Sequence, residues 1–154
     1  MKLAIVTSYP PSKVTLNEYA YHLVKSFRLK AEVSELILLT DETPGEKEID
    51  FKQDGCKITI IECWKFNSYS NVINVTKAIN ETKPDGVLFN LQFMKFGDKK
   101  IPAALGLTLP LVCKFKGIPS IVLLHNILEQ VDLESAGFAS NKLAQKVYNF
   151  IGTS

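Results

Sequence analysis

Five short apolar runs, each followed by a polar or helical segment, constrain this chain of 154 residues more than any other feature. The runs consist almost entirely of apolar residues, interrupted only by Thr59 and Asn90, and lack the regular alternation of apolar and polar residues that a half-exposed strand shows. Strands have this pattern when helices cover both faces of their sheet. Strands that alternate with helices form parallel β-α-β units, so the sequence predicts an α/β fold with a doubly wound, open parallel sheet. The predicted strands are Leu3–Val6, Leu36–Leu39, Ile58–Ile61, Val87–Leu91 and Ile121–Leu124.

Four segments carry apolar residues at the spacing of a helix face. We expect helices over Leu16–Phe27, Val72–Ile79 and Ala103–Lys116, and a fourth around Asn141–Tyr148. Thr15 and Glu18 have the spacing of a capping box at the start of the first helix. The length suits a single domain over residues 1–154. Phe150 to Ser154 resemble the start of another strand, from which we expect the sequence to be the first part of a longer protein.

The charge of the chain excludes one large class of partner. The formal net charge is only +2, and Arg28 is the only arginine among 18 basic residues. Proteins that read nucleic acids use clustered positive charge and bidentate arginine contacts. We therefore expect no nucleic-acid partner.

Three cysteines, Cys56, Cys63 and Cys113, show no CxxC spacing and no neighbouring histidine. Their odd number and spacing argue against a disulfide framework and against a zinc site. The apolar start of the chain ends at Thr7 and is too short for a signal peptide, and no apolar run is long enough to span a bilayer. We expect a cytoplasmic protein with reduced cysteines and no bound metal.

Two loops stand out by their charge. Asp41 to Gly55 is rich in acidic residues and reads as a solvated loop. Leu91 to Ile101 mixes apolar residues with Lys95, Lys99 and Lys100, and two interpretations stay open. Either the loop touches a membrane surface through these lysines, or it packs its aromatic residues inward and leaves the lysines in water.

Ligands of doubly wound sheets bind beyond the carboxyl ends of the strands, where the strand order reverses. For the common order 3-2-1-4-5-6, this crevice lies between the first and fourth strands. The segments predicted to meet there are Ser8 to Thr15, Asn90 to Gln92, and His125 with Asn126. The first of them lacks both the G-x-G-x-x-G pattern of dinucleotide sites and the P-loop pattern.

His125 is the histidine best placed for function, because it directly follows a predicted strand. A neutral imidazole at that position can form a hydrogen bond with a sugar hydroxyl or orient a neighbouring group. His22 lies at the edge of the first helix's apolar stripe and is expected on the surface.

Several segments resemble the N-terminal, acceptor-side domain of the GT-B glycosyltransferases of family 4. The resemblance begins with Lys2–Pro11 and Glu18–Leu23 and runs along nearly the whole chain. It continues in Lys83–Val87 (KPDGV), Gly117–Pro119 (GIP), Leu124–Asn126 (LHN) and Ile151–Ser154 (IGTS).

This resemblance implies a Rossmann-like domain of a retaining glycosyltransferase, which transfers a sugar from a nucleotide-sugar donor to the hydroxyl of an acceptor. It implies that His125 contacts the donor sugar, that the backbone of Val14 and Thr15 lies near the donor phosphates, and that neither a metal nor another cofactor is needed. Asn90, Gln92 and Asn126 are expected, from their positions alone, to be polar groups on the acceptor side of the cleft.

The family's nucleotide-binding half carries a Glu-x7-Glu pair, which this sequence lacks. We therefore expect the C-terminal domain to lie outside these 154 residues and the isolated chain to be inactive. The family's glycine pair in the first loop is replaced by Val14 and Thr15. That replacement keeps a second hypothesis open, a non-catalytic flavodoxin-like binding or scaffold module. A nicotinamide-binding domain is a third hypothesis, with little support because the glycine fingerprint is absent.

Overall fold

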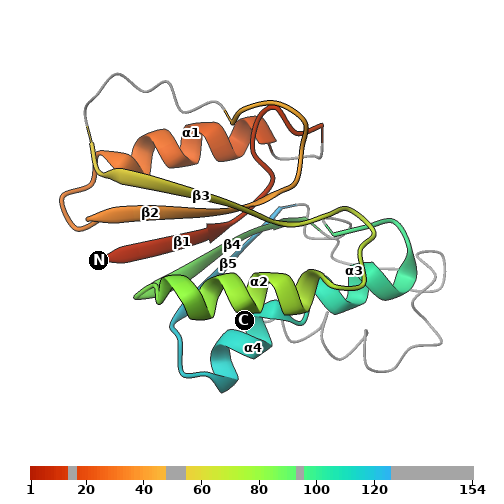
Figure 1. The fold of residues 1–154 in the computed structure, drawn as a ribbon. Helices are drawn as coiled ribbons and strands as arrows, with labels where there is room; N and C mark the ends of the chain where they lie inside the picture. The colour runs from red at the N-terminus through yellow and green to blue at the C-terminus, as the bar shows by residue number, and fades with distance from the viewer. Residues whose placement is uncertain (14–16, 48–54, 93–95, 126–154) are drawn as a thin grey trace.

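Five parallel strands form one sheet in the order β3-β2-β1-β4-β5 (Figure 1). A computed structural model describes residues 1–13, 17–47, 55–92 and 96–125. The elements, in chain order, are β1 (Lys2–Val6), α1 (Asn17–Arg28), β2 (Glu35–Asp41), β3 (Lys57–Trp64), α2 (Asn71–Thr82), β4 (Gly86–Gln92), α3 (Lys100–Gly106), α4 (Leu109–Phe115) and β5 (Ser120–His125). The prediction of a doubly wound parallel α/β sheet is confirmed, as are all five predicted strands.

Helices cover both faces of the sheet, as the continuous apolar strands require. Helix α1 lies on one face, and α2, α3 and α4 lie on the other (Figure 1). Successive side chains of a strand point to opposite faces. Accordingly, Ile5 and Leu88 pack toward α1, whereas Val6 and Phe89 pack toward α2 and α4.

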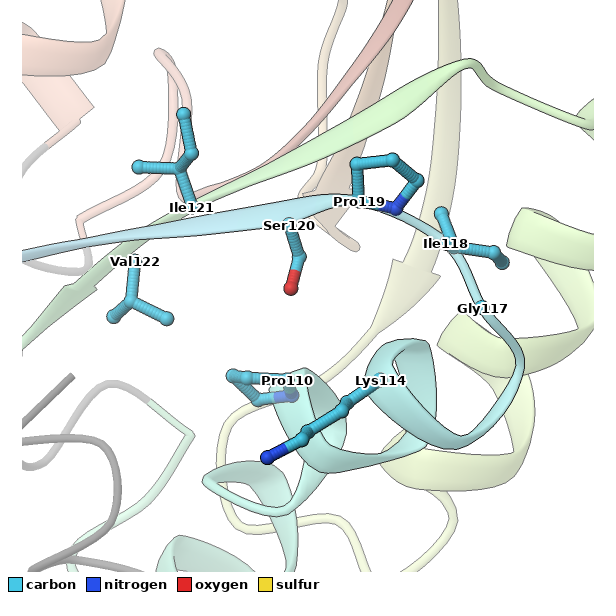
Figure 2. Close-up of a pocket in the computed structure, with 8 residues that line it drawn as sticks. All are labelled: Pro110, Lys114, Gly117, Ile118, Pro119, Ser120, Ile121 and Val122. Atoms are coloured by element: carbon cyan, nitrogen blue, oxygen red, sulfur yellow. The ribbon is translucent and has the colours of Figure 1, made fainter.

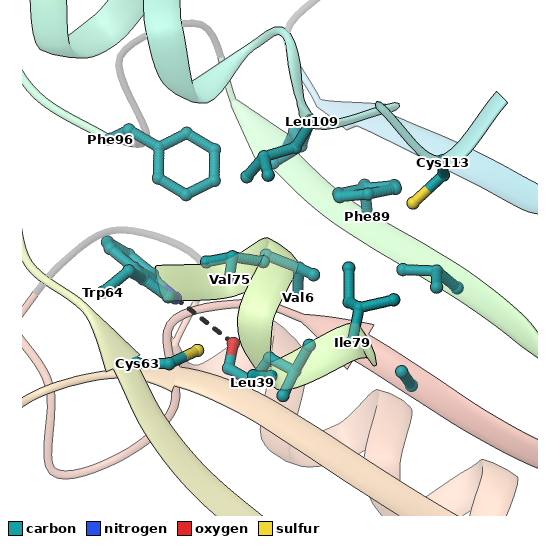
Figure 3. Close-up of a cluster of buried hydrophobic side chains, with 14 of the residues drawn as sticks. Val6, Leu39, Cys63, Trp64, Val75, Ile79, Phe89, Phe96, Leu109 and Cys113 are labelled. Carbon is teal, nitrogen blue, oxygen red and sulfur yellow. Dashed lines mark hydrogen bonds between the residues drawn. The ribbon is translucent and has the colours of Figure 1, made fainter. Parts of the chain in front are cut away.

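The larger core lies on the α2 and α4 side, around Trp64 (Figure 3). The indole of Trp64 is fully buried and meets the ring of Phe96 edge-on, with 5.0 Å between the ring centroids. Its Nε1 donates to the backbone carbonyl of Leu39 at 3.2 Å, which satisfies the only polar atom of the indole. The ring of Phe96 approaches the helix backbone closely at Gly106, where an added Cβ would lie 2.3 Å from the phenyl carbons.

The predicted helix over Ala103–Lys116 is wrong in one respect, because two short helices occupy this segment. Helix α3 ends at Gly106 and α4 begins at Leu109. Pro110 explains the break: it has no N–H to donate to the carbonyl of Gly106, and its ring would clash with that carbonyl in a continuous helix. The other two described helices match their predictions to within a few residues.

Two loop predictions have different outcomes. Asp41 was placed in a solvated loop, and this is wrong: it is the last residue of β2 and is only 3% exposed. In the loop after β4, Phe96 is buried, while Lys99 and Lys100 are exposed. The burial of Phe96 agrees with the inward-packed interpretation, whereas exposed lysines are expected under both interpretations, so the membrane contact stays a prediction. Lys95 lies outside the described residues.

Asn67 fastens the loop after β4 to the loop after β3. Its Oδ1 accepts hydrogen bonds from the backbone N–H groups of Asp98 and Lys99, and its Nδ2 donates to the carboxylate of Asp98. The expected helix around Asn141–Tyr148, the terminal strand and the capping residue Thr15 lie outside the described residues. Within the part of the chain that is described, no helix has the length and apolar character needed to cross a membrane.

Candidate functional site

The strand order reverses at the centre of the sheet. From β1 the chain moves outward through β2 to β3, and then crosses to β4 on the other side of β1. This is the switch point at which open α/β sheets bind their ligands, beyond the carboxyl ends of the strands. β1 and β4 are paired up to Val6 and Phe89, so Thr7 and Asn90 are the next residues on each strand toward that edge.

Three side chains from separate strands form a hydrogen-bonded row at this edge. Asn90 Nδ2 donates to Thr7 Oγ1 at 3.0 Å, and Asn90 Oδ1 lies 2.7 Å from His125 Nε2. Thr7 Oγ1 donates to the backbone carbonyl of Ser8 at 2.8 Å. We call Thr7, Asn90 and His125 the switch-point row. Thr7 and Asn90 are fully buried, whereas His125 is partly buried.

The alternation of the strands explains why these three side chains meet. Ile5, Leu88 and Leu123 belong to the core on the α1 side of the sheet. Asn90 and His125 lie two residues further along β4 and β5. Thr7 directly follows β1, and its N–H still donates to the carbonyl of Leu39 on β2, so all three face the same side. The row thus lies on the α1 face of the sheet, at its carboxyl edge.

Tyr19, in the first turn of α1, completes this part of the site. Its ring meets the imidazole of His125 edge-on, with 4.5 Å between the centroids. The side of the site toward α1 is therefore aromatic, and Tyr19 itself is 43% exposed. The arrangement offers a fixed imidazole and an accessible aromatic ring at one edge, which suits the recognition of a neutral polar ligand.

A second polar cluster lies at the carboxyl end of β2. Ser12 Oγ donates to a carboxylate oxygen of Asp41. The ammonium of Lys47 lies 3.6 Å from Asp41 Oδ1 and 3.7 Å from Glu62 Oε1, and it donates to Thr43 Oγ1 at 2.9 Å. The side chains of Lys47 and Asp41 are only 4% and 5% exposed. We call Ser12, Asp41 and Lys47 the charged cluster; it ties the loop after β1 to β2.

The sequence-predicted residues are placed as follows. His125 and Asn90 are brought together by a direct hydrogen bond. Gln92 is paired with His125 in the β4–β5 register, and its side chain lies outside the described part. The remaining three predicted residues, Val14, Thr15 and Asn126, also lie outside the described residues, so their predicted roles stay predictions.

Sequence reasoning missed Thr7, Tyr19 and the charged cluster. Thr7 had the same signal as Asn90, a polar residue at the carboxyl end of an apolar run. Tyr19 was placed in the apolar stripe of the first helix and in the resembling segment Glu18–Leu23, but no role was expected for it. Nothing in the sequence distinguished Lys47 from the other lysines, because its burial depends on three segments that meet only in the folded chain.

The buried cysteines are unsuited to nucleophilic chemistry. Burial, together with a smaller effect of the charge of Glu42, raises the pKa of Cys63 to about 12. Burial likewise raises the pKa of Cys113 to about 11, against the opposing effect of Lys116. A thiol with such a pKa remains protonated near neutral pH and is a poor nucleophile and metal ligand. Among the described residues, no group of histidine, cysteine and carboxylate side chains is arranged to hold a metal ion.

A hollow of about 560 Å³ lies away from the switch point, between α4 and the first residues of β5 (Figure 2). Ser120 and Val122 point toward Pro110 and Lys114 of α4, while Ile121 points to the other side of the strand (Figure 2). Its lining contains few polar side chains and none of the switch-point row. The geometry of the strands therefore locates the candidate site better than the size of this hollow does.

Comparison of the chain with models of known protein families, with curated proteins and with solved structures finds no match.

Proposed function

We propose that this chain is the Rossmann-like, acceptor-side domain of a retaining glycosyltransferase, and that His125 contacts the sugar of a nucleotide-sugar donor. The observation that carries the proposal is the position of the imidazole. It ends β5 beside the switch point, fixed by Asn90 and flanked by the exposed ring of Tyr19. Sugars are bound by neutral hydrogen-bonding groups and by aromatic rings, and both kinds of group are present here.

The catalytic logic would be positioning combined with electrostatics. The described residues at the switch point offer neither a buried carboxylate nor a reactive thiol. A domain of this kind would hold the sugar and the acceptor, while the donor nucleotide would be bound by a second domain. The unknown acceptor hydroxyl would enter from the same edge of the sheet.

The charged cluster supports this proposal over a nicotinamide-binding domain. In dinucleotide-binding Rossmann domains, an acidic residue after the second strand accepts hydrogen bonds from the ribose. Asp41 occupies the corresponding end of β2, but its carboxylate accepts a hydrogen bond from Ser12 and is paired with Lys47. It is buried and already engaged, so a ribose would have to displace both partners.

The test uses the fact that the chain has only two histidines. His125 belongs to the switch-point row, and His22 is exposed on α1, where it serves as an internal control. We expect millimolar uridine or guanosine diphosphate hexoses to shift the imidazole NMR resonances of His125 and to leave those of His22 in place. Binding is expected to be weak, because the proposed nucleotide-binding domain is not part of the 154 residues.

Two outcomes would count against the proposal. If no nucleotide hexose shifts His125 selectively, the imidazole does not contact sugar. A selective shift with NAD but not with nucleotide hexoses would favour the dinucleotide hypothesis. A sugar-transfer assay adds a separate check, because transfer by these 154 residues alone would contradict the expectation that catalysis needs a second domain.

The non-catalytic binding module remains the second candidate, favoured by Val14 and Thr15 at the positions of the family's glycine pair. Side chains at these positions make a close approach of the backbone to phosphate, and a positive φ, costly. If that module is correct, free hexoses and nucleotide hexoses should shift His125 to the same extent, because the diphosphate would add nothing to binding.

A further inference from the structure

The hydrogen bonds of the switch-point row define which nitrogen of His125 carries the proton. Thr7 Oγ1 lies 2.8 Å from the backbone carbonyl oxygen of Ser8. Two oxygens at this distance share a proton, and a carbonyl has none to give. Thr7 must therefore use its only hydroxyl proton for Ser8.

This use of the Thr7 proton determines the orientation of Asn90. The hydroxyl oxygen of Thr7 can now only accept, so the group of Asn90 that faces it at 3.0 Å must be the NH₂. The amide oxygen of Asn90 then faces His125. The orientation of an asparagine amide is assigned from such a network, and here the network permits one choice.

The orientation of Asn90 in turn determines the state of His125. The amide oxygen of Asn90 is an acceptor and lies 2.7 Å from His125 Nε2, so Nε2 must carry a proton. We propose that Thr7 and Asn90 form a positioning relay that holds the neutral imidazole of His125 in its Nε2-protonated tautomer. Both relay residues are fully buried, so water does not compete for their hydrogen bonds.

The tautomer has a consequence for the class of ligand that the ring can recognise. In the neutral ring the lone pair is on Nδ1, so any group that meets Nδ1 must donate a hydrogen bond. The hydroxyl of a sugar or another polyol can donate, whereas an ionised phosphate oxygen cannot. A ligand group that reaches Nδ1 of the neutral ring must therefore be a hydroxyl rather than an anionic oxygen. This last step depends on the proposed function; the tautomer itself does not.

Tyr19 provides a matched control for the relay. It touches the imidazole through its ring, and that contact has no acceptor or donor role in the row. A Tyr19→Ala variant should change the chemical shifts of His125 through the lost ring contact, but it should leave the tautomer unchanged. Variants of Thr7 and Asn90 should alter the tautomer instead.

The experiment is ¹⁵N-resolved NMR of the imidazole rings in the full 154-residue chain, above the pH at which His125 becomes neutral. We expect Nε2–H for His125 in the wild type and in Tyr19→Ala. Thr7→Val removes the acceptor for the amide, lets Asn90 turn over, and should raise the population of the Nδ1–H form at least several-fold. Thr7→Ser, which keeps the hydroxyl, should restore the wild-type tautomer, and His22 should be unchanged in every variant.

Asn90→Asp gives a second readout that survives if Thr7→Val does not fold. A carboxylate accepts from Nε2–H in either orientation and favours the charged imidazolium, so the titration midpoint of His125 should rise while the tautomer is retained. The proposal is overturned if wild-type His125 is the Nδ1–H tautomer, or if Thr7→Val and Asn90→Asp both behave as the wild type. If the tautomer is as expected but no sugar shifts His125, the relay stands and the proposed function fails.

Discussion

The two polar clusters at the carboxyl edge lie on opposite sides of β1 and differ in charge and in access. The switch-point row joins β1, β4 and β5 through neutral groups, and its last member, His125, is only partly buried. The charged cluster joins the loop after β1 to β2 through an ammonium and a carboxylate whose side chains are about 95% buried.

The difference follows from the cost of burying charge. An ammonium or carboxylate that leaves water must find partners within the protein, because its desolvation costs several kcal/mol. The charged groups of this cluster are therefore already paired, and their interactions hold the loop after β1 to β2. Neutral groups do not need an ionic partner, and the ring of Tyr19 stays 43% exposed beside the imidazole. The comparison favours a structural role for the charged cluster and supports the row as the site of the proposed function.

The largest expected effect comes from Lys47→Met, which removes the cation of the charged cluster. It leaves the carboxylate of Asp41 buried without its ionic partner, and we expect the free energy of unfolding to fall by about 3–5 kcal/mol. Urea denaturation followed by circular dichroism measures this change. Combining the variant with Asp41→Asn should recover part of the loss, because the unpaired charge is then gone.

Lys77→Met is the matched control for Lys47→Met. Lys77 is 73% exposed and pairs with Glu81 at 3.9 Å on the surface of α2, so its removal should change stability by less than about 0.5 kcal/mol. If both variants change the free energy of unfolding equally, the charged cluster does not have the structural role assigned to it.

Asn90→Ala is expected to have a smaller effect, because the row carries no formal charge. Removing the amide leaves buried hydrogen-bonding capacity on Thr7 and costs about 1–3 kcal/mol of stability. Asn74→Ala, in an exposed position on α2, should cost less than about 0.5 kcal/mol in the same thermal or urea assay. A larger loss for Asn90→Ala than for Lys47→Met would reverse the assignment of the two clusters.

The fold could be read from the sequence because it depends on features that are local and repeated. Consecutive aliphatic residues identified the strands, and the alternation of strands with helices implied the parallel sheet. Pro110 was visible in the sequence, but its effect was underestimated, because the apolar stripe continues across it. A periodic pattern shows which residues face the core, but it does not show whether the backbone between them is continuous.

The site was only partly predictable. The rule for parallel sheets located Asn90 and His125, since it needs only the ends of the strands. The charged cluster could not be found this way. Whether Asp41 is solvated or buried depends on Ser12 and Lys47, which are far from it in sequence or lie in a polar loop without periodicity. Partners of this kind meet only in the folded chain.

On each side of β1 there is also one buried cysteine whose raised pKa makes the stability of the fold depend on pH. Cys63 lies on β3, on the same side of β1 as the charged cluster, and its pKa is raised to about 12. Cys113 lies on α4 beside β5, and its pKa is raised to about 11. Unfolded thiols ionise near pH 9, whereas these remain protonated in the folded chain. The unfolded state thus binds fewer protons above pH 9, and stability falls as the pH rises from about 9 toward these values.

Above pH 9, each thiol should lower the free energy of unfolding by up to about 1.4 kcal/mol per pH unit, which is the free energy that corresponds to one pKa unit. Urea denaturation at pH 8, 9 and 10 should show a decline that is shallower in Cys63→Ala and in Cys113→Ala. Glu42→Gln should weaken the contribution of Cys63 alone, because Glu42 is one cause of its raised pKa. A decline that is unchanged in both alanine variants would mean that neither thiol is buried in the folded chain.

The smallest expected effect concerns the start of α3, where Lys99 and Lys100 are exposed. We predict that the chain co-sediments with phosphatidylserine vesicles at low ionic strength, with about 1 kcal/mol from each lysine near the surface. Phe96 is buried and is not available for insertion, so the attraction should be electrostatic and should disappear as salt shortens the screening length.

The double variant Lys99→Ala/Lys100→Ala should bind such vesicles less than Lys25→Ala/Lys30→Ala, which loses the same charge at the far end of α1. Equal losses would mean that only net charge matters, and no co-sedimentation at low salt would leave the loop after β4 as an inward-packed connection. Preferential loss in the first variant would place a lipid surface at the start of α3, which Asn67 ties to the loop after β3 and which lies on the face of the sheet opposite α1 (Figure 1).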